Sequence, residues 1–349
     1  MVLGIDIGKY SIKMVQLSKD GETIKLENLG ILNTFDDLNK FNLDNLSKSQ
    51  LSACIQDLAV KMDIKPKKMK NIVTSLSGKS IDIRQITTLD MSDEELLVSL
   101  ELEAKKHVPL DGTEAIIDYY HIGNNPSELD KIDIILVTTT KNKIKDHSNI
   151  VKASGFKPGV FDADPIALSN LYQYNKRFPN DGADVILNIG HTSTTLIVWG
   201  KNSSFFTRDI EIGGHEINKK IIQELNCDYL DSDNKKNTEG INAFDMENNN
   251  DDENSGIAIE KRTIFNDFAE EIRKTLRFYM KSNNQSFFNT FYLSGGCANI
   301  PGIKDFIMSN LNVKIENFDI FENIKTDINI ENPEQYSIAL GLALRGLEL

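Results

Sequence analysis

Two stretches of the chain repeat the same order of apolar runs and turns. In the first, apolar and polar residues alternate from Leu3 to Ile7, residues 12–17 form a second apolar run, and Asp20-Gly21 is a strong hairpin signal. Residues 185–212 repeat this plan, with a glycine at each turn. Each stretch therefore predicts three antiparallel strands, and two copies of one unit predict two similarly folded domains that face each other.

The residues between and after these stretches predict helices with recognisable ends. Ser92 and Glu95 form a capping box that predicts a helix ending before Pro109, and Thr140 is the expected cap of a helix that ends at Gly155. Further helices are expected from Asp164-Pro165, after Gly213-Gly214, over residues 264–279, after Pro301 and after Pro333. Strands are expected over residues 81–88, 115–121 and 131–138, so that residues 75–150 form a small α/β insert.

Charge and composition narrow the class of protein. The 349 residues include 52 Asp and Glu against 39 Lys and Arg, a net charge of −13, and such an acidic surface repels nucleic acid and anionic lipid. Three cysteines without a CxxC pair form neither a disulfide framework nor a zinc site, which indicates a reducing cytosol. The chain has no run of about 18 apolar residues and no basic leader, so we expect neither a membrane span nor a signal peptide.

Residues 228–256 differ from the rest of the chain in composition. They hold nine acidic residues and two lysines, together with many asparagines and few apolar residues. This composition predicts a solvated, mobile loop.

The first turn, between Gly4 and Lys13, carries residues that suit a phosphate. Gly8 permits a tight hairpin whose backbone N–H groups could face an anion. In a short hairpin, Asp6 and Lys13 point into the same mouth, where the carboxylate suits the water shell of Mg²⁺ and the ammonium suits phosphate oxygens. The alternative is an ordinary hairpin with solvated charges.

Two further turns carry similar features. Residues 188–194 form the equivalent turn of the second stretch, with hydroxyls and amides that suit phosphate contact, or else a polar β-turn. Gly295-Gly296 ends a predicted strand, and paired glycines allow a flat ring such as adenine to lie on the backbone. Taken alone, such a pair is more often an ordinary turn.

The order and spacing of these features resemble the five signatures of the actin, Hsp70 and sugar-kinase superfamily. These are two phosphate turns, an adenosine turn and two connecting helices, the second of which carries Ala339, Gly341 and Ala343. Other stretches resemble more closely the PilM family of type IV pilus assembly proteins, whose fold is similar to that of the division protein FtsA. They are residues 4–13, 103–109, 118–119, 161–164, 207–208, 212–214 and 271–273.

The resemblance covers nearly the whole chain and implies a fold. The expected fold class is α/β, an actin-like (ribonuclease H-like) arrangement of two lobes with an FtsA-type α/β insert in the first lobe. The first lobe would comprise residues 1–167 and 326–349, with the insert at about 75–155. The second lobe would comprise residues 168–325, with a small subdomain at about 215–290 that includes the acidic loop 228–256.

The resemblance also implies a ligand, a partner and a location. ATP with Mg²⁺ would lie in the cleft between the lobes, where the two phosphate turns converge. The partner would be the N-terminal cytoplasmic tail of the membrane protein PilN, held in a groove between the first lobe and the insert, alongside other pilus platform proteins. The protein would then be cytoplasmic and peripheral at the inner membrane through this partner, with a role in twitching motility. No nucleic acid and no direct membrane insertion are expected, and a homodimer stays open.

The residues implied to bind the nucleotide come from the three turns and their neighbours. They are Asp6, Gly8, Lys9, Tyr10, Ser11, Lys13, Asn188, Gly190, His191, Thr192, Ser193, Thr194, Gly213, Gly214, Gly295, Gly296 and Cys297, with Asp6 holding the metal through water. Asp164, at the start of the first connecting helix, is the catalytic candidate for orienting an attacking water, and its alternative role is that of a helix N-cap. We expect His191 to be a polar turn residue rather than a catalyst.

Three departures from the superfamily pattern bear on activity. Asn188 stands where an Asp is usual, and its amide lacks the charge that holds metal-bound water, so hydrolysis is in doubt more than binding is. Lys9 and Tyr10 make the first turn bulkier, although Lys9 could add a phosphate contact. The acid–lysine pair that flanks the ribose has no clear match, and Lys235 or Lys236 could stand in for its lysine.

Three hypotheses for function follow. The leading one is a nucleotide-binding scaffold with at most slow ATPase activity, in which nucleotide closes the lobes and the closed form presents the peptide groove. The alternative is an FtsA- or MreB-like polymer-forming ATPase, for which we expect too little chain after the last helix to form an amphipathic membrane helix. The third is a small-molecule kinase, for which Asp164 is a weak candidate base.

Overall fold

The first lobe is built on a five-stranded sheet of order β3-β2-β1-β4-β8. The computed structural model describes residues 1–106, 113–244, 262–316 and 318–348. The strands are β1 (Val2–Ile7), β2 (Ser11–Asp20), β3 (Thr23–Asn33), β4 (Ile72–Leu76) and β8 (Val160–Ala163). The first three pair antiparallel and the last two join in parallel, so the predicted opening hairpins are confirmed.

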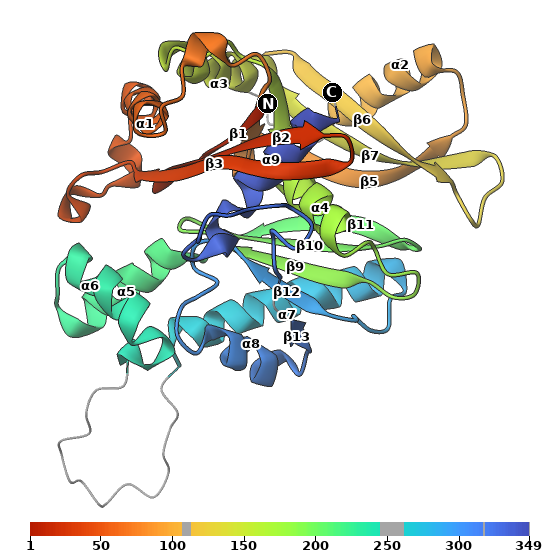
Figure 1. Cartoon of the computed structure of the whole chain (residues 1–349). Helices are drawn as coiled ribbons and strands as arrows, with labels where there is room; N and C mark the ends of the chain where they lie inside the picture. The colour runs from red at the N-terminus through yellow and green to blue at the C-terminus, as the bar shows by residue number, and fades with distance from the viewer. Residues whose placement is uncertain (107–112, 245–261, 317, 349) are drawn as a thin grey trace, which may run out of the picture.

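The second lobe repeats this sheet in the order β11-β10-β9-β12-β13. Its strands are β9 (Asp184–Ile189), β10 (Thr194–Gly200), β11 (Ser203–Ile210), β12 (Phe291–Ser294) and β13 (Ile315–Glu316). Strands β9 to β11 again form an antiparallel meander, and β12 joins β9 in parallel. Figure 1 shows the first lobe above the second, so the predicted repeat of one unit is confirmed.

Two helices connect the lobes and lie between their sheets (Figure 1). They are α4 (Asp164–Asn175) and α9 (Ser337–Leu347), which follows the short η6 (Pro333–Tyr336). One hydrophobic cluster contains Leu168 of α4, Leu342 of α9 and Ile197 of the second sheet, so a single core joins the two lobes here. The helices cross closely because Gly341 faces the backbone of Ala167, with room for no side chain.

The insert lies between β4 and β8 in sequence and forms a third sheet of order β5-β7-β6. Its strands are β5 (Asp82–Leu89), β6 (Ala115–Asn124) and β7 (Lys131–Thr140), and α2 (Asp93–Ala104) covers one face through Leu96 and Leu100. Helix α3 (Lys141–Ala153) instead packs on α1 (Lys48–Lys61) of the first lobe, where Ser52 Oγ donates to the Ile150 carbonyl at 3.0 Å. Helix α2 ends at Ala104, so its expected end before Pro109 is confirmed.

Helices pack on the second sheet and form the small subdomain beside it. They are α5 (Gly214–Leu225), α6 (Tyr229–Thr238), η5 (Gly240–Phe244), α7 (Ile264–Asn283) and α8 (Ile303–Leu311). The prediction of a loop over residues 228–256 is wrong for its first part, because α6 and η5 occupy residues 229–244. Asp228 caps α6, and Tyr229, Ser232 and Lys236 bury one face of it. Residues 245–256 lie outside the described residues.

The remaining described segments are short turns of helix. They are η1 (Leu38–Lys40), η2 (Leu43–Asn45), η3 (Pro66–Lys68) and η4 (Gly78–Ser80). Within the described parts of the chain, no helix has the length and apolar character needed to cross a bilayer.

Candidate functional site

The first turn joins a carboxylate and an ammonium at the mouth of the β1–β2 hairpin. Asp6 and Lys13 are cross-strand partners, and Lys13 Nζ donates to Asp6 Oδ2 at 3.1 Å. Both side chains are largely buried, at 10% and 14% exposure. A Cβ on Gly8 would lie 2.6 Å from the Ser11 carbonyl oxygen, so the turn requires glycine. The structure thus brings Asp6, Gly8 and Lys13 together as the sequence predicted.

Asp164 lies behind this turn at the start of α4. Burial raises its pKa well above the ordinary value, and the nearby Asp6 carboxylate raises it further, while a hydrogen bond from Ser75 Oγ works in the opposite direction. The alternative role as helix N-cap is wrong, because Ala163 occupies the cap position and no side chain caps this helix. The carboxyl group of Asp164 therefore interacts with Ser75 and Asp6 and does not cap the helix.

We expect replacement of Asp164 by asparagine to stabilise the protein near neutral pH, by on the order of a few kcal/mol. A buried aspartate with a raised pKa binds more protons in the folded state than in the unfolded one. Its contribution to the free energy of unfolding therefore falls as pH rises from about 4, the ordinary aspartate value, towards the raised pKa. Asparagine keeps an acceptor for Ser75 and has no charge to desolvate.

Thermal unfolding of both proteins between about pH 4 and about pH 8 measures this effect. The variant and the wild type should have similar midpoints at the acid end, where Asp164 is protonated, and diverge as pH rises. A difference that does not change with pH would contradict the assigned burial of the carboxylate.

The second turn, residues 190–193, is held by the start of α5. Gly214 N–H donates to the Gly190 carbonyl at 3.1 Å, and His215 N–H donates to the His191 carbonyl at 2.7 Å. A Cβ on Gly213 would lie 2.7 Å from the Gly190 oxygen, so this contact requires glycine. Gly213 and Gly214 therefore position the second turn.

Two predicted site residues of the second lobe serve packing instead. The Thr194 hydroxyl is fully buried and donates its only proton to the Ile212 carbonyl at 2.8 Å. The predicted hydrogen bond from this hydroxyl to a phosphate is therefore wrong. Cys297 is buried under Gly214, and burial raises the pKa of its thiol. Its backbone N–H donates to the Ile189 carbonyl at 2.9 Å, which ties the third turn to β9.

The third turn lies beside the end of β9. Gly295 has a positive φ of 89°, and a Cβ there would lie 2.8 Å from Asn188 Oδ1. Asn188 is 8% exposed and accepts a long hydrogen bond of 3.4 Å from Ser294 Oγ. A Cβ on Gly296 would meet no atom nearer than 3.9 Å, so the backbone at Gly296 is open to an approaching flat group.

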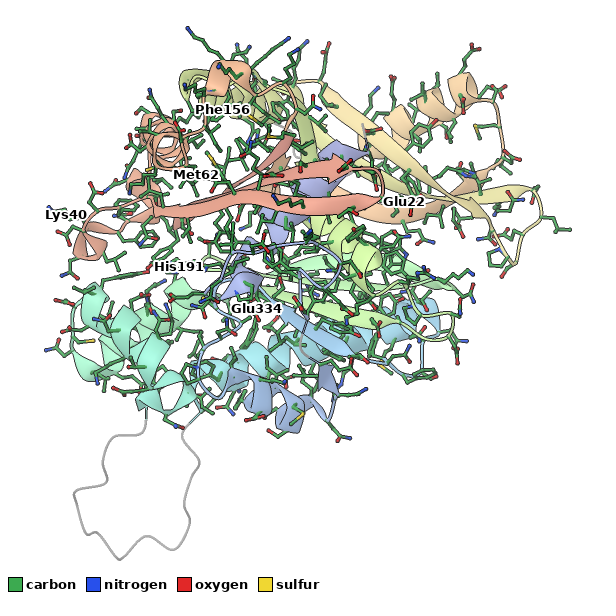
Figure 2. All side chains as sticks on the ribbon, viewed as in Figure 1. Glu22, Lys40, Met62, Phe156, His191 and Glu334 are labelled. Atoms are coloured by element: carbon green, nitrogen blue, oxygen red, sulfur yellow. The ribbon has the colours of Figure 1, made fainter. Side chains whose placement is uncertain are left out.

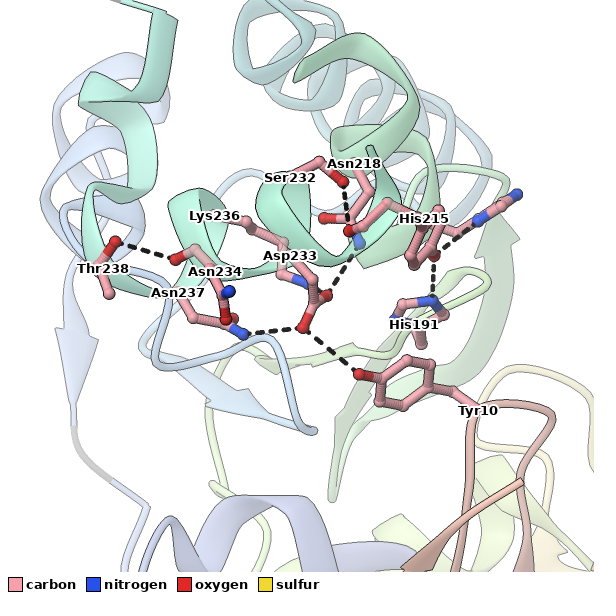
Figure 3. A network of polar contacts seen from close by, with 11 residues as sticks. Tyr10, His191, His215, Asn218, Ser232, Asp233, Asn234, Lys236, Asn237 and Thr238 are labelled. Carbon is pink, nitrogen blue, oxygen red and sulfur yellow. Dashed lines mark hydrogen bonds and ion pairs between the residues drawn. The ribbon is translucent and has the colours of Figure 1, made fainter. Parts of the chain in front are cut away.

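The tips of the first and second turns meet across the lobes. The ring of Tyr10 stacks on that of His191, with centroids 3.8 Å apart and an interplanar angle of 23°. Figure 2 shows His191 at the boundary between the lobes, and Figure 3 shows Tyr10 reaching α6, where its hydroxyl donates to Asp233 Oδ2 at 3.3 Å. The expected convergence of the two turns is therefore confirmed.

A buried ion pair in α6 lies next to the stacked rings, in contact with the Tyr10 hydroxyl. Lys236 and Asp233 are 3% and 8% exposed and pair directly, and Asn218 Nδ2 donates to Asp233 Oδ1 at 2.8 Å. Although burial raises the pKa of Asp233, the Lys236 ammonium and the Asn218 donor lower it overall. The sequence predicts Lys235 or Lys236 as the stand-in lysine but does not predict Asp233, because the composition of residues 228–256 predicts a loop. Tyr229, Ser232, Asp233 and Lys236 recur at helical spacing, which was the available signal.

A model of a protein family described as type IV pilus assembly protein PilM matches residues 4–347 of this chain. The chain belongs to the PilM family. Among solved structures, it is similar to one described as the PilM-PilN type IV pilus biogenesis complex, with a TM-score of 0.82 and 23% identity over 100% of this chain and 99% of that one. It is also similar to the ethanolamine utilization protein EutJ from Carboxydothermus hydrogenoformans, with a TM-score of 0.53 and 13% identity over 98% of this chain and 89% of that one.

These likenesses agree with the geometry of the two lobes. The predicted actin-like α/β fold is confirmed for this PilM-family chain. Membership of the PilM family places the chain in type IV pilus assembly. The turns at Gly8, Gly190 and Gly295 form the candidate site: the first two meet through the rings of Tyr10 and His191, and the third lies beside Asn188 at the end of β9.

Proposed function

We propose that this chain is a nucleotide-binding scaffold that holds the cytoplasmic tail of a membrane partner during pilus assembly. The observation that carries the proposal is the convergence of two glycine turns from like-folded lobes, beside the buried pair of Lys13 and Asp6. Backbone amides at glycine turns and a buried lysine suit phosphate groups. The open backbone at Gly296 suits a flat base, so the residues present fit an adenine nucleotide.

The same residues favour binding over rapid hydrolysis. Asp6 would hold Mg²⁺ through its water shell, and Lys13 would neutralise phosphate oxygens. The raised pKa of Asp164 keeps its carboxyl group protonated near neutral pH, and a protonated acid does not accept a proton from an attacking water. Asn188 supplies no negative charge. We therefore expect at most slow ATPase activity.

The insert presents a surface for the partner's peptide. Tyr120 of β6 shares a sheet face with Ile135 of β7 and Gln85 of β5. At β5 and β7 this face packs against the two lobes, whereas at β6 Tyr120 and Ile116 remain 64% and 39% exposed. We infer that this uncovered part of the inner face, next to the first lobe, is the peptide groove.

The opposite wall of this groove is β8, the outer strand of the first sheet. Asp162 on β8 has a buried Oδ2 atom without a hydrogen-bond partner among the described residues, and the pKa of Asp162 is raised by burial, with Asp118 of β6 adding to the shift. Because β6 and β8 are both outer strands of their sheets, an extended peptide between them would find free backbone groups as well as a carboxylate acceptor.

The similar solved structure is described as a PilM-PilN complex, and this supports PilN as the partner. We propose its N-terminal tail as the peptide. Binding to that tail would hold the protein at the cytoplasmic face of the inner membrane. Calorimetric titration of a synthetic PilN tail, with and without Mg-ATP, tests the proposal. We expect saturable binding that the nucleotide changes about fivefold or more, which is a coupling of about 1 kcal/mol. Absence of peptide binding in both conditions would contradict it.

We expect replacement of Tyr120 by alanine to weaken peptide binding about tenfold or more, because exposed aromatic side chains in a docking surface typically dominate its affinity. Tyr120 is exposed in the free protein, so the variant should keep its thermal midpoint. The matched control is Leu102→Ala on α2, which is 61% exposed on the opposite side of the same insert. Equal loss of binding in both variants, or none in either, would place the peptide elsewhere.

A further inference from the structure

The contact between the two turns leaves no room for a phosphate at their tips. The Tyr10 and His191 rings are at van der Waals distance, with centroids 3.8 Å apart, and we call this contact the interlobe stack. Burial lowers the pKa of His191, so its imidazole is neutral, and His191 Nε2 is within 2.9 Å of the Tyr229 hydroxyl. A group the size of phosphate enters between the two tips only if the rings separate.

The interlobe stack is part of a wider contact between the first lobe and α6. Phe41 lies edge-on to both Tyr10 and His191, with centroids 5.5 Å and 5.1 Å away. Asn39 binds the start of α6 twice: its Oδ1 accepts from the Leu230 N–H at 2.9 Å, and its Nδ2 donates to Asp228 Oδ2 at 3.2 Å. These contacts hold the small subdomain of the second lobe against the first lobe.

The two buried lysines near the turns are already paired within the protein. Lys13 pairs with Asp6, and Lys236 pairs with Asp233, which also accepts hydrogen bonds from Asn218, Asn237 and the Tyr10 hydroxyl. Loss of the Tyr10 hydroxyl would leave Asp233 with its three other partners, Lys236, Asn218 and Asn237. The ring of Tyr10, rather than its hydroxyl, is therefore the element that blocks the space between the turns.

We propose that the Tyr10 ring is a latch that closes the space between the two turns by stacking on His191, and that the terminal phosphate of a bound nucleotide displaces this ring. This inference rests on the proposed nucleotide site and describes how access of nucleotide to that site is regulated. Nucleotide binding must then break the interlobe stack, so part of the binding free energy is used to release the latch. Removing the ring removes that cost and raises the apparent affinity.

The test compares Tyr10→Ser, which removes the ring, with Tyr10→Phe, which keeps the ring and removes the hydroxyl. Tyr174→Ser, at an exposed tyrosine of α4, is the control. Calorimetry with Mg-ATP and Mg-ADP gives the affinity of each protein, and the ¹H–¹³C spectrum of the histidine rings reports the ring current of Tyr10 on His191. We expect Tyr10→Ser to bind Mg-ATP at least about tenfold more tightly than the wild type, since the stack and hydrogen bond it loses are together worth over 1.4 kcal/mol.

The latch also predicts the results for the other variants and for the spectra. Tyr10→Phe should stay closer to the wild type in affinity, and Tyr174→Ser should match it. The His191 resonance should move in Tyr10→Ser without ligand, and in the wild type once Mg-ATP is added. Nucleotide binding by the wild type with an unchanged or weaker affinity in Tyr10→Ser, or with an unmoved His191 resonance, would overturn the latch alone. No nucleotide binding by either protein would overturn the proposed site and the latch with it.

Discussion

Replacement of Lys13 by alanine is expected to lower the affinity for Mg-ATP about 100-fold or more. Truncating one partner of a buried charge pair costs about 2–5 kcal/mol, and about 1.4 kcal/mol corresponds to a factor of ten. The loss has two sources here: the phosphate loses its ammonium, and the Asp6 carboxylate is left uncompensated next to the incoming negative charge. Calorimetry or a fluorescent nucleotide analogue measures the change.

The control for this variant is Lys25→Ala. Lys25 also pairs with an acid, Glu27, but its side chain is 47% exposed and lies on β3, away from the turn. Exposed pairs contribute about 0–1 kcal/mol to stability, so this variant should match the wild type in folding and in nucleotide affinity. Wild-type affinity in a folded Lys13→Ala protein would show that the first turn does not hold the phosphates.

Replacement of Gly341 by alanine is expected to lower the midpoint of thermal unfolding by several degrees. In an open helix the same change stabilises by about 1 kcal/mol, because alanine has the higher helix propensity. Here a Cβ at position 341 would lie 2.1 Å from the Ala167 carbonyl oxygen, so α9 and α4 must move apart. Overpacking of this kind costs about 1–3 kcal/mol or more, which reverses the sign.

Asn149→Ala provides the matched measurement for the gain in helix propensity alone. Asn149 is exposed on α3, so an alanine side chain at this position contacts solvent and not a neighbouring helix. We expect this control to keep or slightly raise the midpoint. A stabilised Gly341→Ala protein would contradict the close crossing of the connecting helices, on which the placement of the two lobes depends.

The sequence predicts the parts of the fold that depend on local pattern. The β1–β2 hairpin is one, because alternation and a short turn fix the register that pairs Asp6 with Lys13. The capping box at Ser92 and the cap at Thr140 are others, since each needs residues only three positions apart. Gly341 was recognisable as a small residue in the last helix, although its partner Ala167 was not.

Features that depend on tertiary packing could not be predicted from the sequence. Helix α6 is polar and acidic, so its composition resembles that of a loop, and its helical state depends on burying Tyr229 and Lys236 against neighbouring elements. The stack of Tyr10 on His191 joins residues of different lobes, and no local pattern encodes such a contact. Asp164 fits an N-cap by sequence alone, and only the position of Ser75 shows where its carboxyl group lies.

The most direct test of the central claim is a crystal structure of the protein with a non-hydrolysable ATP analogue and Mg²⁺. The account predicts phosphate density between the turns at Gly8 and Gly190, a base against Gly295-Gly296, and a Tyr10 ring that has left His191. Density for the analogue at another surface would contradict the claim that these turns form a nucleotide site, whereas an unchanged interlobe stack beside the bound analogue would contradict the latch alone.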